Sequence, residues 1–135
     1  AFSIARREEA DGYSGRFAIV GGDYSKPDVG ASATAYQPTL LIRVAVKPST
    51  TPPHGYRSAV AYDPQQKLWI TVGPNGTDIS TDDGRNWTPL KPSNQDPPDA
   101  DKNWNALSLP YVVGPNGRIG KLRPIHPPAK EHPQK

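Results

Sequence analysis

The arginines are the residues of this sequence whose chemistry best suggests a binding site. Arg43, Arg57, Arg85 and Arg118 recur along the chain, and Tyr56 directly precedes Arg57. A guanidinium group can hold an anion through two parallel hydrogen bonds, which fix the position and the orientation of the anion. Arginines on strands more often solvate the surface of a sheet. On this pattern, Tyr56, Arg57 and Arg118 are the predicted ligand-binding residues.

Metal and cofactor chemistry find little support. The histidines His54, His126 and His132 lack the H-x-x-x-H and H-E-x-x-H spacings that place two imidazoles on one face of a helix. The chain has no cysteine, so it has no disulfide framework and no thiolate metal ligand. The Gly-Pro-Asn-Gly sequence at 73–76 lacks the Lys-Ser/Thr pair and the helix of a phosphate-binding loop. We predict no metal, no cofactor and no catalytic residue.

Residues 80–87, Ser-Thr-Asp-Asp-Gly-Arg-Asn-Trp, form the most constrained pattern of the chain, S-x-D-x-G-x-x-W. The short carboxylate of Asp82 can accept backbone N–H groups inside a tight turn. Gly84 supplies the positive φ that a hairpin turn needs, and Trp87 can then wedge its apolar surface between sheets. We interpret Ser80, Asp82, Gly84 and Trp87 as structural. The alternative is that Asp82 or Asp83 takes part in a reaction.

The composition indicates short strands joined by turns. The 135 residues include 17 Pro and 12 Gly, and hydrophobic residues make up only 34%. No segment keeps an i, i+3, i+4, i+7 apolar stripe for three turns, so long helices are not expected. No apolar run approaches the roughly 18 residues of a membrane span. The net charge is +3, and the basic residues are interspersed with acidic ones. This distribution favours a solvated surface over a nucleic-acid patch.

Internal repeats organise the chain. Residues 17–22, 69–76 and 111–117 are apolar, β-rich strands that end in a Gly-containing turn, and the last two share Val-Gly-Pro-Asn-Gly. Each repeat has a preceding strand, at 2–5, 57–62 and 105–109, and a following one, at 31–36, 77–80 and 118–121. A fourth strand is expected at 40–46 and 87–90. The spacing of about 40–55 residues is typical of propeller blades.

The repeats divide the chain into units. The predicted blades are residues 1–48, 55–91 and 103–123, and the last blade stops after its third strand. Pro-rich linkers at 47–53 and 92–98 separate them, because proline fixes φ and blocks unwanted strand pairing. Residues 124–135 are polar and Pro-rich, and we expect them to form an extended arm.

These features together resemble the BNR/Asp-box β-propellers related to the photosystem II assembly and stability factor. The matching stretches are residues 20–28, 55–62, 72–80 and 113–119, and S-x-D-x-G-x-x-W resembles the Asp box of such blades. The resemblance implies the C-terminal three blades of a six- or seven-bladed wheel, exported from the cytoplasm, that binds partners and does not catalyse. The sequence starts in what looks like a strand. Its N-terminus has no signal-peptide pattern, and we expect that any signal peptide has already been removed.

Two departures from that family pattern matter. Where the first blade should carry its Asp box, residues 35–41 read Ala-Tyr-Gln-Pro-Thr-Leu-Leu, and the N-terminal half of the wheel is absent. Three blades alone would leave two apolar faces and a strand edge uncovered. We therefore expect association, either of two copies that close a ring by two-fold symmetry or with a second chain that supplies the missing blades.

The function predicted from the sequence is a binding or assembly module that recognises a peptide or protein. The main alternative is a sialidase-like glycoside hydrolase, or a carbohydrate-binding propeller fragment, because Asp boxes occur in those proteins too. Hydrolysis generally needs a carboxylate pair at a defined separation, and the sequence alone does not identify one. Nucleic-acid binding is disfavoured because the three tryptophans fall on predicted strands at core-like positions.

Overall fold

The computed structural model describes residues 3–8, 15–31, 33–37 and 46–125. In these residues the protein is all-β, with three antiparallel sheets of four, four and three strands and no α-helix. The first sheet contains β1 (Ser3–Glu8), β2 (Gly15–Val20), β3 (Thr34–Tyr36) and β4 (Lys47–Pro48). The second contains β5 (Ala59–Asp63), β6 (Leu68–Val72), β7 (Thr77–Ser80) and β8 (Thr88–Pro89). The third contains β9 (Ala106–Ser108), β10 (Tyr111–Val113) and β11 (Ile119–Lys121).

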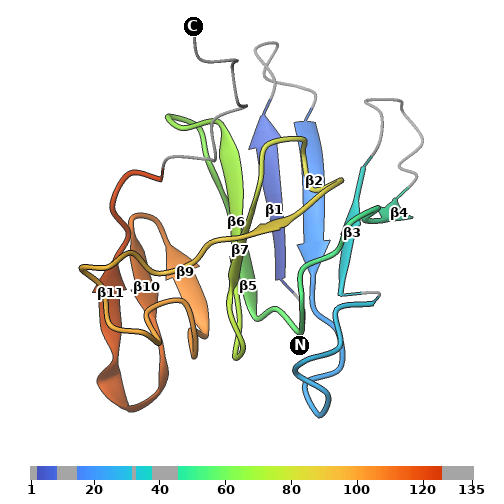
Figure 1. Cartoon of the computed structure of the whole chain (residues 1–135). Helices are drawn as coiled ribbons and strands as arrows, with labels where there is room; N and C mark the ends of the chain where they lie inside the picture. The colour runs from blue at the N-terminus through green and yellow to red at the C-terminus, as the bar shows by residue number, and fades with distance from the viewer. Residues whose placement is uncertain (1–2, 9–14, 32, 38–45, 126–135) are drawn as a thin grey trace, which may run out of the picture.

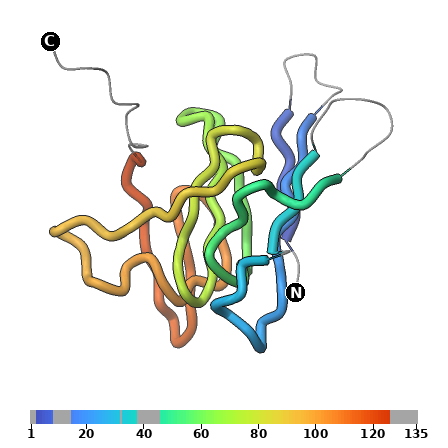
Figure 2. The backbone as a smooth tube through the Cα atoms, turned by 45° about the vertical axis from the view of Figure 1, so that its right-hand side comes forward, coloured from blue at the N-terminus to red at the C-terminus, as the bar shows by residue number. Residues whose placement is uncertain are grey.

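The three sheets stand face to face in chain order, with the second sheet in the middle (Figure 1). Within each sheet the strands follow the order of the sequence, and every neighbouring pair is antiparallel. The first strands of the sheets are neighbours in space, since β1 contacts β5 and β5 contacts β9. Figure 2 shows the same succession of layers from a second direction.

Local sequence explains where the strands turn. The two Val-Gly-Pro-Asn-Gly copies make equivalent connections, the first between β6 and β7 and the second between β10 and β11. The first is closed by a hydrogen bond from the Gly73 N–H to the Gly76 carbonyl, 3.0 Å long. The second is one residue longer and includes a short 3₁₀ turn at Pro115–Gly117. It is closed by a hydrogen bond from the Gly114 N–H to the Arg118 carbonyl, 2.8 Å long. Asn116 there has φ +59°, a value that asparagine tolerates better than most residues.

The cores lie between the sheets. One cluster joins the first and second sheets, and two further clusters join the second sheet to the third sheet and the residues that follow it. All residues of β6 and β7 are buried, because neighbouring sheets cover both faces of the second sheet. On β1, by contrast, exposed and half-buried residues alternate, which is the pattern of a strand covered on one face.

The fourth strand of the first sheet was expected at 40–46, of which residues 40–45 lie outside the described residues. The fourth strand that the structure describes, β4, is formed by Lys47 and Pro48. The predicted linker at 47–53 is also part of the fold. Its Thr51 forms an isolated parallel bridge with Asn86 of the 80–87 turn, because the chain leaving β4 runs alongside that turn.

The start of the predicted C-terminal arm lies against the second sheet. The Ile125 N–H donates to the Gln66 side-chain oxygen at 2.6 Å, and the Ile125 side chain packs on the cluster of Leu68, Ile70 and Ile79. The remainder of the arm, residues 126–135, lies outside the described residues. Among those described, no helix is long and apolar enough to cross a membrane.

Candidate functional site

The 80–87 turn has the local chemistry that the sequence predicts. Ser80 Oγ donates to Asp82 Oδ1 at 2.8 Å, and the Gly84 N–H donates to Ser80 Oγ at 2.9 Å. Asp82 Oδ1 also accepts the Asn86 backbone N–H at 2.9 Å, while Asp82 Oδ2 accepts the Asn86 side-chain amide at 2.7 Å. Gly84 adopts φ +86°. Desolvation opposes ionisation of Asp82, but these hydrogen bonds outweigh it and lower the pKa of its carboxyl group.

Asp83 joins the turn to the first sheet. Its carboxylate accepts hydrogen bonds from Arg7 Nε at 2.8 Å, Arg7 Nη2 at 3.1 Å and the Trp69 indole N–H at 3.1 Å. Arg16 Nε lies 3.5 Å from Asp83 Oδ2 and completes an ion-pair network. Asp83 therefore links β1 and β2 to the second sheet. Both acidic residues of the turn are engaged by donors, which favours the structural interpretation over a reactive one.

Trp87 fills the space between the first and second sheets. It is 3% exposed and packs with Ala18, Val20, Val60 and Trp69. Its backbone N–H donates to the Thr51 carbonyl at 2.9 Å, and its indole N–H donates to Ser49 Oγ at 3.3 Å. The turn thus holds the chain that leaves β4 as well as its own sheet.

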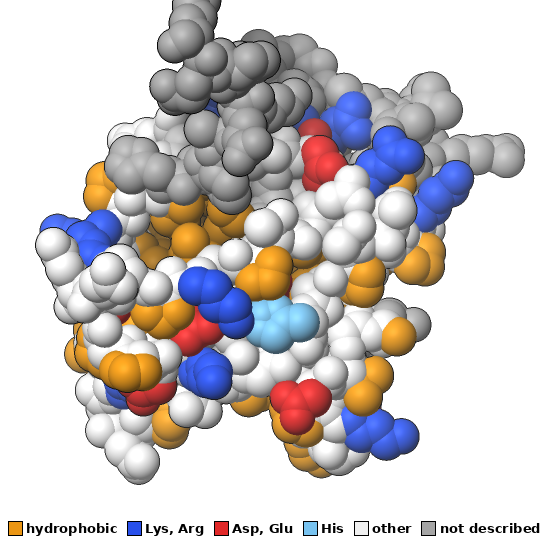
Figure 3. All heavy atoms as spheres, viewed as in Figure 1, with side chains coloured by type: hydrophobic (Ala, Val, Ile, Leu, Met, Phe, Trp, Pro, Cys, Tyr) orange, Lys and Arg blue, Asp and Glu red, His pale blue; other side chains and the backbone are white. Residues whose placement is uncertain are grey.

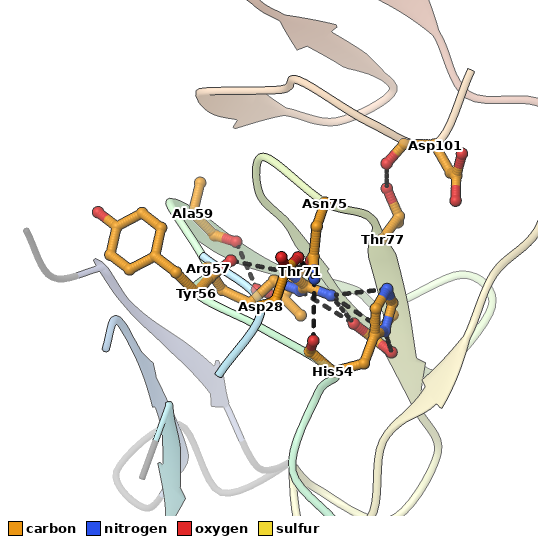
Figure 4. Close-up of polar contacts among 10 residues, drawn as sticks. Asp28, His54, Tyr56, Arg57, Ala59, Thr71, Asn75, Thr77 and Asp101 are labelled. Carbon is orange, nitrogen blue, oxygen red and sulfur yellow. Dashed lines mark hydrogen bonds and ion pairs between the residues drawn. The ribbon is translucent and has the colours of Figure 1, made fainter. Parts of the chain in front are cut away.

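Arg57 is the most enclosed of the predicted ligand-binding residues. Its side chain is fully buried, and Nε donates to Asp78 Oδ2 at 2.9 Å (Figure 4). Nη1 donates to the Tyr56 carbonyl and to Asn75 Oδ1, both at 2.7 Å. His54 Nδ1 lies 3.1 Å from Asp78 Oδ1 and 3.2 Å from Arg57 Nη2. Burial lowers the pKa of Arg57, and the neighbouring Asp78 opposes that shift.

The three predicted ligand-binding residues occupy two separate places. Tyr56 is 6% exposed and lies beside Arg57. Arg118 lies in the connection between β10 and β11, where its guanidinium group stacks over the Trp104 ring at 4.1 Å and donates to the carbonyls of Asp99 and Lys102, both at 3.0 Å. Arg57 does not present its guanidinium group to solvent, so ligand binding by this trio stays a prediction.

Sequence reasoning missed the partners that complete the Arg57 cluster. Asp78 is fully buried although it lies on a short strand, and His54 and Asn75 come from the connections before β5 and after β6. Asn75 also donates to Asp28 Oδ1 at 3.0 Å and to the His54 carbonyl at 2.9 Å. The sequence did contain one signal for Asp78: it is the only charged residue in the predicted strand at 77–80, where the other residues are Thr, Ile and Ser.

The outer faces of the first and third sheets expose apolar side chains. On the third sheet, Tyr111, Val113 and Ile119 are 50%, 41% and 72% exposed, and Val113 pairs with Ile119 across the strands. We call this face the third flank. On the first sheet, Ile4 is 61% exposed and pairs with the half-buried Ile19. We call this face the first flank; it has a hollow of about 310 Å³ lined by Ile19, Ala35, Val46 and Pro48 among others.

No protein-family model, curated protein or solved structure matches this chain. Within the described part of the chain, no group of three or more His, Cys, Asp or Glu residues is arranged to hold a metal ion.

Proposed function

We propose that the chain is a segment of an Asp-box β-propeller and that it works as a non-catalytic binding and assembly module for a peptide or protein. Three features support the proposal: the sheets follow one another face to face, their first strands are neighbours, and the 80–87 turn has the hydrogen bonds described above. The resemblance noted in the sequence also suggests an extracytoplasmic location.

The observation that carries the proposal is the pair of apolar flanks at the two ends of the stack. The second sheet is covered on both faces, whereas the outer faces of the two end sheets present Ile4, Val113 and Ile119 to solvent. Exposed apolar patches of this kind mark sites of association. A propeller avoids such faces by closing into a ring.

The partner that fits both flanks at once is a second copy of this chain. In a two-fold arrangement the first flank of each copy would face the third flank of the other, so two three-sheet segments would make a six-bladed ring. A different chain that supplies the missing blades would cover the same two surfaces. The two cases differ in the mass of the purified protein.

The sialidase-like alternative gains no support from Arg57. An anion site needs guanidinium groups open to the ligand, and Arg57 is fully buried against Asp78. Its donors are used by Asp78, Tyr56 and Asn75. The binding function is therefore the better supported of the two.

Mass measurement in solution, by light scattering or native mass spectrometry, tests ring closure. We expect a species of twice the 14.6 kDa chain mass. Ile119→Asp and Ile4→Asp should each shift it towards monomer, because each places a charge on one flank. Tyr24→Asp is the matched control, since Tyr24 is 75% exposed but lies in the loop between β2 and β3.

Mixing the two flank variants sharpens the test. In a mixed pair, one of the two contacts joins unmodified flanks, so dimer should partly return when Ile119→Asp and Ile4→Asp chains are combined. An unmodified chain that stays monomeric at high concentration would rule out closure by a second copy. Equal loss of dimer with Tyr24→Asp would show that the flanks are not the interface.

A further inference from the structure

A cleft of about 510 Å³ lies between the second and third sheets. Its walls come from β6 and β7, from the segment that connects the two sheets, and from β10, β11 and the residues that follow. Figure 3 shows hydrophobic side chains gathered in a hollow between these sheets. Protein cavities that bind ligands commonly have volumes of about 300–1,000 Å³. The cleft is large enough for a side chain or a small ligand.

Asp101 lines this cleft and has an unusual environment for an acidic residue. It is only 6% exposed, and its Oδ1 atom is buried without a hydrogen-bond partner among the described residues. Its backbone carbonyl accepts Thr77 Oγ1 at 2.8 Å, which ties the residue to the second sheet (Figure 4). Asp78, the other buried acid in the described part of the chain, is fully engaged by Arg57 and His54. A buried acceptor without a donor is costly, so Asp101 is suited to a donor that a ligand brings.

The basic residues that line the cleft do not supply that donor. Arg118 donates to backbone carbonyls, and Arg123 pairs with Asp96 at 2.6 Å. Lys91 and Lys121 are exposed, so water and salt screen their charges. The buried carboxyl group of Asp101 lies in a less polar setting, where electrostatic interactions are stronger. The buried Arg57 also acts on Asp101 through its charge, but its donors go to Asp78, Tyr56 and Asn75. A head group with a positive charge and free N–H donors would therefore suit Asp101.

We propose that this cleft binds an arginine or lysine side chain of a partner polypeptide. The basic head would donate to Asp101, and the aliphatic stem would lie along the apolar wall that includes Val72, Val112 and Leu122. The inference rests on the binding function proposed above and names the chemistry of its partner. It does not depend on ring closure, because one chain supplies all the residues of the cleft.

The test uses two matched peptides on the full chain labelled with ¹⁵N. Acetyl-Leu-Arg-Leu-amide should shift the indole N–H resonance of Trp104, which lines the cleft and donates to the Ala100 carbonyl at 2.8 Å. The indole resonances of Trp69 and Trp87, which lie between the first and second sheets, serve as internal references. The same peptide with citrulline in place of arginine keeps the shape but lacks the charge, and it should bind about tenfold more weakly.

Variants locate the interaction. Asp101→Asn should weaken binding of the arginine peptide about tenfold or more, whereas Asp23→Asn should leave it unchanged, because Asp23 is exposed in the loop between β2 and β3, away from the cleft. Equal affinity for the arginine and citrulline peptides, tighter binding of a glutamate peptide or an unaffected Asp101→Asn variant would each overturn the proposal. If Asp101→Asn does not fold, the comparison of the arginine and citrulline peptides on the unmodified chain still tests whether the cleft binds a basic side chain.

The outcome is separable from that of the proposed ring. The mass measurement reports on closure with no peptide present. A monomer that binds the arginine peptide at Trp104 would refute closure alone, and a dimer that binds neither peptide would refute the basic-side-chain site alone.

Discussion

The second and third sheets contain the same five residues, Val-Gly-Pro-Asn-Gly, at 72–76 and 113–117, yet the two copies have different surroundings. Val72 is 1% exposed, and Val113 is 41% exposed. In the first copy Asn75 binds Arg57, Asp28 and the His54 carbonyl, whereas Asn116 in the second copy is exposed. The same local sequence therefore makes the same kind of connection, and the neighbouring sheet decides what is buried.

The contrast extends along the strands. Ile70 and Thr77 of the second sheet are buried, and the residues in the corresponding positions of the third sheet, Tyr111 and Ile119, are 50% and 72% exposed. Val72 packs against Trp104 and Val112 of the third-sheet region. No described residue covers Val113 in the same way. The third sheet thus covers its neighbour without being covered on its own outer face, which is the physical reason to expect a partner there.

The largest effect should come from the charged pair beside the second sheet. Arg57→Ala would leave the fully buried Asp78 without its main partner, which typically costs about 3–5 kcal/mol of unfolding free energy. Arg118→Ala in the third-sheet region removes surface hydrogen bonds and a stacking contact, at about 1 kcal/mol or less. Urea denaturation measures both. Similar losses for the two arginines would contradict the asymmetry between the sheets.

A smaller effect compares the twin valines directly. Val72→Ala should lower the unfolding free energy by about 1.5–3 kcal/mol at every protein concentration, because it removes methyl groups from a closed core. Val113→Ala should cost less than about 0.5 kcal/mol in the monomer. If a second copy covers the third flank, the cost at Val113 should grow with protein concentration while that at Val72 stays constant. Thermal denaturation over a dilution series distinguishes these outcomes.

Sequence patterns predicted most of the fold because strands and turns are local. Gly-containing turns and apolar runs placed the strands of the second and third sheets. The hydrogen bonds of Asp82 and the positive φ of Gly84 follow from residues 80–87 alone, whereas the burial of Trp87 also needs the first sheet to pack against it. The third sheet has the three strands that were expected. Strand β4, which falls in the predicted linker, depends on pairing with β3 and not on a strong β-forming sequence, since it consists of Lys47 and Pro48.

The site could be predicted only where its chemistry is local. Arg57 was expected to face a ligand, and its burial depends on Asp78, His54 and Asn75, which come from strand β7 and from two separate connections. No short sequence pattern predicts that residues so far apart in the chain will contact one another. Asp101 likewise lies in a polar segment with no motif, and its burial arises from the docking of that segment against Thr77. Non-local packing therefore decides which polar residues are structural and which are left unpaired.

The smallest effect concerns acid stability at the 80–87 turn of the second sheet. The pKa of Asp82 is lowered in the folded state, below the usual value near 3.9. Its ionised form therefore stabilises the fold above that value, and this contribution is lost as the pH falls through the folded-state pKa. Asp82→Asn should reduce stability at pH 7 by roughly 0.5–1 kcal/mol and should flatten the loss of stability between about pH 5 and pH 2.

The matched variant for this turn is Asp99→Asn, which removes the same charge from the exposed segment before the third sheet. Because Asp82 is exposed, solvent screening keeps its electrostatic contribution small. The fixed hydrogen bonds from Ser80 and Asn86 are what should separate the two variants. Urea midpoints recorded across the acid range provide the measurement. Parallel pH profiles for Asp82→Asn and the unmodified chain would mean that the turn depends on its shape alone, and that its carboxylate is replaceable by any acceptor of the same size.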